Sequence, residues 1–120
     1  MADWPDSAQP GFIAFFSDAR NNNVKLPEDR AYQPLPQIEK TMREVLTAPD
    51  NFFGVVDRGN VILQFAVNDD STIRIDLPDP TRKGSLVKDA DLEECIALVR
   101  QAGPSLATLN IVGMKFESWE

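Results

Sequence analysis

Apolar and polar residues alternate over two stretches in the middle of the chain, residues 61–67 and residues 72–77. A third stretch, residues 51–56, is apolar and rich in residues that favour strands. Short segments of Asn, Asp, Gly and Ser separate the three stretches, and these residue types favour turns. Because successive side chains of a strand point to opposite faces, the pattern predicts an antiparallel meander of three strands.

A helix is predicted before this meander. Pro36 suits the first turn of a helix, and apolar residues follow it at helical spacing. They are Ile38, Met42, Val45 and Leu46. Pro49 predicts the end of this helix, because the residue before a proline disfavours helical geometry.

A second helix is predicted within residues 89–102. Its apolar stripe consists of Leu92, Cys95, Ile96 and Val99. Asp89 or Asp91 can cap the first turn, because a carboxylate there accepts hydrogen bonds from free backbone N–H groups. Gly103 followed by Pro104 is a strong signal for the end of a helix.

The remaining segments are less regular. Residues 1–11 predict an irregular N-terminal arm, and residues 17–35, rich in Asn and Pro, predict a long loop. The apolar run 12–16 fits a buried strand or a helical turn. Prolines in residues 78–84 predict another loop, and residues 106–116 predict a final strand.

These elements predict one α+β domain over residues 1–120, an antiparallel β-meander with two helices packed on one face. A chain of 120 residues buries about two-thirds of its surface on folding, enough for one ordinary core. Strands grouped together between helices favour this class over alternating parallel units.

The charge of the chain restricts its partners. Twelve Lys and Arg against nineteen Asp and Glu leave a net charge of −7, with a pI near 4.5. Direct binding of nucleic acid or of an anionic membrane surface needs clustered basic residues, so we expect neither. A basic protein partner fits the charge, although acidity also serves solubility alone.

The N-terminus has neither the basic start nor the apolar run of a signal peptide, and no apolar stretch is long enough to cross a membrane. One cysteine cannot form an internal disulfide. We therefore expect a cytoplasmic protein.

Catalytic chemistry has few candidates. Histidine is absent, no phosphate-binding glycine loop is present, and Cys95 lies on an apolar stripe where an inert buried thiol is expected. Carboxylates remain, but no spaced calcium loop or zinc motif is present. We expect no enzyme activity, no cofactor and no resident metal.

The acidic residues from residue 69 to residue 94 form three sets: Asp69 and Asp70; Asp76 and Asp79; and Asp89, Asp91, Glu93 and Glu94. If strand 61–67 pairs with strand 72–77, the first two sets lie at opposite ends of the sheet. The second and third sets are joined by what reads as one loop, which predicts that they share an edge. The candidate partner-binding residues are therefore Asp76, Asp79, Asp89, Asp91, Glu93 and Glu94. Helix capping and solvation explain the same residues without a partner.

Residues 38–119 resemble the immunity proteins of bacterial polymorphic-toxin and contact-dependent inhibition systems. The shared features are the meander, the closing helix and strand, and the acidic charge. The resemblance is one of architecture and charge and includes no diagnostic motif. It implies a non-catalytic inhibitor that binds a cognate toxin domain and occludes its active site. Whether the protein is a monomer or a homodimer stays open.

Two alternatives stay open. One is a small carboxylate-dependent enzyme, with or without a divalent metal, which requires a pocket with at least two inward carboxylates. The other is a self-associating or ligand-binding module. Ile62, Ala66 and Phe53, if they lie on the sheet face away from the helices, would favour it.

Overall fold

The computed structural model describes residues 11–19, 22–26, 29, 31–57, 59–102, 106, 111 and 113–119. Nearly all of the predicted irregular arm, the stop signal Gly103–Pro104 and much of the predicted strand 106–116 lie outside the described residues.

Within the described residues the fold contains eight strands and two α-helices. In chain order the elements are β1 (Gly11–Asp18), β2 (Asn23–Lys25), β3 (Ala31–Pro34), α1 (Leu35–Val45), β4 (Phe52–Val56), β5 (Ile62–Val67), β6 (Ile73–Asp79), the 3₁₀ turn η2 (Pro80–Arg82), β7 (Gly84–Ala90), α2 (Leu92–Ala102) and β8 (Lys115–Ser118). The protein is a single α+β domain, as predicted.

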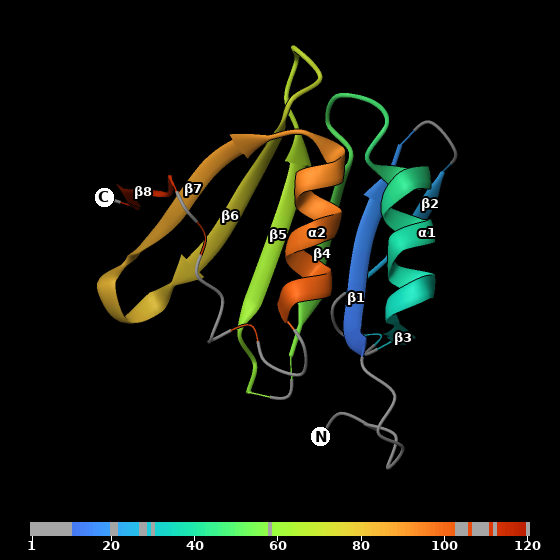
Figure 1. Cartoon of the computed structure of the whole chain (residues 1–120), viewed down its shortest axis with the longest axis horizontal. Helices are drawn as coiled ribbons and strands as arrows, with labels where there is room; N and C mark the ends of the chain where they lie inside the picture. The colour runs from blue at the N-terminus through green and yellow to red at the C-terminus, as the bar shows by residue number, and fades with distance from the viewer. Residues whose placement is uncertain are drawn as a thin grey trace.

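All strand pairs are antiparallel, and the sheet has the order β2-β1-β4-β5-β6-β7-β8. β3 also pairs with β1, along the half of β1 that β2 leaves free. Figure 1 shows α1 and α2 side by side on the same face of the sheet. The predicted meander is confirmed as β4, β5 and β6.

The main core lies between the helices and the sheet. Leu63, Phe65 and Ile75 face the helices and are fully buried, which confirms the alternation in β5 and β6. From the helices, Ile38 and Met42 of α1 meet Cys95, Ile96 and Val99 of α2 in the same cluster. Amphipathic helices gain most of their stability from such packing.

β1 settles the open question of residues 12–16, because it is a strand. Phe12, Ala14 and Phe16 join the main core, whereas Ile13 and Phe15 form a second cluster on the other face. A strand that is buried on both faces carries a continuous apolar run and shows no alternation. The ambiguity of the sequence therefore follows from the burial of β1 on both faces.

The predicted loop 17–35 is wrong in part. It contains the end of β1 and two short strands, β2 and β3. β3 ends at Pro34, directly before α1, and both short strands lie on the outer side of β1. Edge strands tolerate proline and polar residues because one side needs no ladder hydrogen bonds, so these segments lack the usual strand signals.

The predicted loop 78–84 is also wrong in part, and a strand after it was missed. β6 runs through Pro78 to Asp79, and β7 pairs back along it, Ile73 opposite Ala90 and Asp79 opposite Gly84. β5 pairs with β6 only as far as Asp76. Pro78 therefore lies where one side of β6 is open, which a proline tolerates.

The end of the chain also differs from the prediction. The final strand is β8, shorter and later than residues 106–116. Leu106 is buried, and its backbone N–H donates to the Asp57 carboxylate at 2.8 Å. Gly113 lies in a turn with a φ of +87°, a conformation that glycine adopts without strain.

Candidate protein-binding surface

One end of the molecule gathers the turn between β5 and β6 with the junction of β7 and α2. The Asn68 side-chain amide donates to the Asp89 carboxylate at 3.1 Å and to the Thr72 hydroxyl at 3.0 Å. The backbone N–H of Thr72 donates to the Asp70 carboxylate at 3.0 Å. Asn68 thus joins the turn to β7 and holds Asp69 and Asp70 beside Asp89.

The start of α2 supplies the remaining carboxylates. Asp91 accepts a hydrogen bond from the backbone N–H of Glu94 at 2.8 Å, so Asp91 caps the helix. Asp89 does not, because it belongs to β7. Lys88 reaches Glu94 at 2.5 Å.

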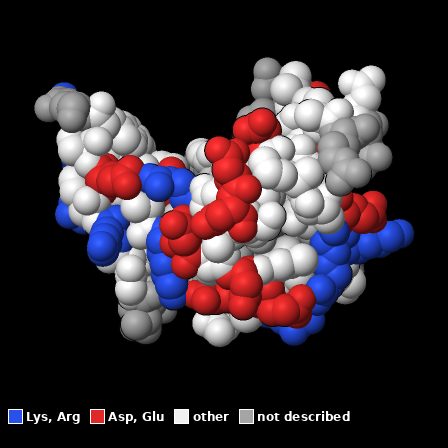
Figure 2. Space-filling view, turned by 90° about the horizontal axis from the view of Figure 1, so that it is seen from above, with Lys and Arg blue, Asp and Glu red and all other residues white. Residues whose placement is uncertain are grey.

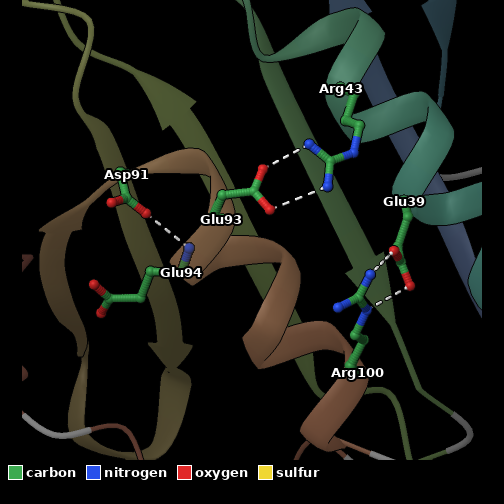
Figure 3. Close-up of polar contacts among 6 residues, drawn as sticks. All are labelled: Glu39, Arg43, Asp91, Glu93, Glu94 and Arg100. Carbon is green, nitrogen blue, oxygen red and sulfur yellow. Dashed lines mark hydrogen bonds and ion pairs between the residues drawn. The ribbon is translucent and has the colours of Figure 1, made fainter.

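Two ion pairs hold α2 against α1 (Figure 3). Arg43 donates to both carboxylate oxygens of Glu93, at 2.6 and 3.1 Å, and Arg100 donates to both oxygens of Glu39. These hydrogen bonds lower the pKa of Glu93 and the pKa of Glu39. Three of the four side chains are exposed and Glu39 is half-buried, so the pairs orient the helices more than they stabilise them.

We call Asp69, Asp70, Asp89, Asp91, Glu93 and Glu94 the acidic end. Of these, Asp69, Asp70, Asp89 and Asp91 are exposed, and no described Lys or Arg forms an ion pair with them. Figure 2 shows this end from above, with acidic side chains in a band across its middle and Lys and Arg mostly at the sides. A hydrogen bond from the Thr72 hydroxyl lowers the pKa of Asp70, so this group stays ionised.

The structure separates the predicted candidate residues. Asp89, Asp91, Glu93 and Glu94 are together, but Asp79 pairs with Gly84 at the opposite end of β7. Five residue steps of strand, about 17 Å, separate Gly84 from Asp89. Asp79 accepts a hydrogen bond from the Arg82 backbone N–H at 3.4 Å.

Asp76 also lies away from the acidic end, on the sheet face opposite the helices. It pairs in register with Gln64 and Val87, and its Oδ1 is buried without a hydrogen-bond partner among the described residues. The prediction that Asp76 and Asp79 share an edge with the start of α2 is therefore wrong. The missed strand β7 carries the chain back along β6 and brings α2 beside Asp69 and Asp70 instead.

Two hollows on the surface of the described residues have volumes of about 240 Å³ each. The first hollow contains the carboxylates of Asp89 and Glu117. Both already have partners, because Arg74 forms an ion pair with Glu117 and the Asn68 amide donates to Asp89. The second contains Asp79 as its one carboxylate. In the part of the chain that the structure describes, no group of three or more Cys, Asp or Glu side chains could hold a metal ion.

Cys95 is buried, as predicted. Its burial in α2 against the sheet raises the pKa of the thiol to about 12. A thiol that stays protonated is a poor nucleophile, so the structure supports an inert packing role.

Comparison with known proteins finds no relative. No family model, curated protein or solved structure matches this chain. Among the described residues, no helix has the length and apolar character needed to cross a membrane.

Proposed function

We propose that the protein is a non-catalytic inhibitor that binds a basic protein domain through the acidic end. One observation carries the proposal. Four exposed carboxylates from two separate segments are held together by the Asn68–Asp89 hydrogen bond and the Asp91 cap, without basic partners among the described residues. Gathering like charges is unfavourable by itself, so a partner that neutralises them gains from the arrangement.

The physics of such binding is simple. Exposed carboxylates form charge-assisted hydrogen bonds with Lys and Arg, and a negative surface speeds the approach of a positive partner. The ion pairs of Glu93 and Glu94 keep α2 in place, so Asp89 and Asp91 are positioned before binding. A partner therefore meets carboxylates whose backbone positions are fixed by hydrogen bonds, which reduces the entropy lost on association.

The class of partner follows from this chemistry. A domain that acts on nucleic acid has a basic cleft, and an acidic end placed in that cleft would exclude the substrate. This is the mode of action that the resemblance to immunity proteins implies. We accordingly propose a cytoplasmic immunity role against a bacterial toxin domain, with no cofactor and no catalytic step.

A capture experiment with matched variants tests the proposal. The tagged protein and two triple variants are used to capture partners from the source cells, with mass spectrometry as the readout. Asp69→Asn, Asp89→Asn and Asp91→Asn together remove charge from the acidic end. The control variant, Asp29→Asn, Asp76→Asn and Asp79→Asn, removes the same charge elsewhere.

We expect one basic protein to be captured by the native chain and the control variant, and to be lost with the acidic-end variant. Recombinant partner would then show its activity blocked by the native chain. Equal capture by both variants would contradict the proposed surface. Capture without inhibition of the partner would contradict the inhibitor role.

A further inference from the structure

A different surface, the outer edge of the sheet at β8, carries a second inference. β8 is the last strand in the sheet, and all four of its residues are exposed. Phe116 is 40% exposed, and Trp119, which follows the strand, is 55% exposed. Large aromatic residues at an open strand edge are unusual for a surface that meets only water.

The backbone direction of β8 follows from one hydrogen bond. The N–H of Trp119 donates to the carbonyl oxygen of Lys83 at 2.9 Å, so the backbone of Trp119 faces β7. Backbone groups in an antiparallel strand alternate between its two neighbours. Lys115 and Glu117 therefore also direct their backbone groups toward β7, whereas Phe116 directs its N–H and C=O away from the sheet.

The side chains of β8 are held in place by neighbouring elements. Glu117 shares one face with Lys115, and Arg74 of β6 binds the Glu117 carboxylate at 2.5 Å. On the other face, the Arg82 guanidinium lies 4.3 Å from the centre of the Phe116 ring. Lys115 forms no ion pair within the described residues.

Two copies of β8 could pair in an antiparallel manner in few ways. Hydrogen bonds form only if residues whose backbone N–H and C=O groups point away from the sheet lie opposite each other in the two copies. The two-fold axis must therefore pass through a residue and not between two residues. If most of the strand is to be paired, that residue is Lys115, Phe116 or Glu117. An axis at Lys115 or at Glu117 places like charges directly opposite, which is destabilising. An axis at Phe116 places Lys115 of each copy opposite Glu117 of the other.

We propose that a second copy of this chain pairs with β8 about a two-fold axis at Phe116. The strand is self-complementary only in this register. It gains two cross-strand pairs of opposite charge on one face and places the two Phe116 residues opposite each other on the other face. The two sheets then join into one. The acidic end takes no part in this contact, so the dimer does not depend on the proposed inhibitor role.

Charge reversal tests the register. Sedimentation of the native chain over a range of concentrations is compared with Lys115→Glu, Glu117→Lys and the double variant. Each single change places like charges across the axis and is expected to weaken dimerisation about tenfold. The double variant restores opposite charges and is expected to restore the dimer. Circular dichroism of each variant checks that it is folded.

Three results would overturn the proposal. The native chain could stay monomeric up to its solubility limit. Its dimerisation affinity could be unchanged by both single reversals, or the double variant could dimerise as weakly as the single variants. A second measurement is independent of charge. Phe116→Cys places two thiols at the axis, about 5.5 Å apart between Cα atoms, within reach of a disulfide. Mild oxidation should link this variant and leave the exposed control Thr81→Cys unlinked, and equal linking of both would contradict the register.

Discussion

Two turns flank β5, and both are built from Asp, Asn and Gly or Ser, yet their carboxylates have opposite roles. In the turn before β5, Asp57 is 2% exposed and accepts hydrogen bonds from the backbone N–H groups of Gly59, Val61 and Leu106, at 2.8 to 2.9 Å. In the turn after β5, Asp69 and Asp70 are exposed. The Asp57 carboxylate is enclosed by backbone N–H groups from two segments, whereas Asp69 and Asp70 remain exposed and Asp70 accepts hydrogen bonds only from Thr72 in its own turn among the described residues.

The difference depends on what folds back over each turn. Leu106, which follows α2, is buried against the first turn and completes the shell around Asp57. The second turn is instead met by the polar end of β7, where Asn68 reaches Asp89. A carboxylate becomes structural when several backbone N–H groups converge on it, and composition alone does not reveal this.

The largest expected effect is the loss of the Asp57 carboxylate. Asp57→Ala leaves three backbone N–H groups without their acceptor, one of them in a buried residue. We expect the free energy of unfolding, measured by urea denaturation, to fall by about 3 kcal/mol. Asp70→Ala is the matched control in the other turn and should cause a much smaller loss. Equal losses would contradict the contrast between the turns.

A smaller effect is expected at Asn68. Asn68→Ala removes the hydrogen bonds to Thr72 and Asp89 and should lower the free energy of unfolding by about 1 kcal/mol. It should also increase amide exchange in the turn 68–72, because the turn loses its attachment to β7. Unchanged exchange would show that Asn68 does not hold the acidic end together.

The smallest effect concerns the ion pairs between the helices. The pKa of Glu39 and the pKa of Glu93 are lowered from 4.5 in the folded protein, because arginines bind the ionised forms. Their contribution to stability is therefore present above pH 4.5 and is lost as the pH falls through the lowered values. The variant Glu39→Gln with Glu93→Gln should show a flatter decline of the unfolding midpoint between about pH 5 and pH 3. An identical decline would contradict the assignment.

Much of the fold was predictable because periodicity reports burial. β5 and β6 alternate since one face meets the helices, and α1 and α2 carry apolar stripes for the same reason. β7 was missed because it lies near the edge of the sheet. Each face of β7 carries both polar and apolar side chains. Leu86 and Lys88 lie on one face, and Val87 and Asp89 lie on the other.

The candidate site was predictable only in part, for the same reason. The place before an apolar stripe predicted a helix cap at Asp89 or Asp91, and the structure shows that the cap is Asp91. Which other carboxylates lie near Asp91 depends on the path of residues 78–90. Because strand β7 was missed, Asp76 and Asp79 were predicted as neighbours of Asp91, whereas the structure places Asp69 and Asp70 there. Local patterns thus identified the groups, and long-range pairing decided their neighbours.

The association rate with the captured partner is the most direct test of the acidic end. It should be measured at low and at high salt for the native chain and for the triple variant Asp69→Asn, Asp89→Asn and Asp91→Asn. At low salt, we predict that the native chain associates at least about tenfold faster than the variant. The difference between the two association rates should shrink at high salt, because salt screens the charges. Equal rates at low salt would contradict the central claim that the acidic end guides the partner to this protein.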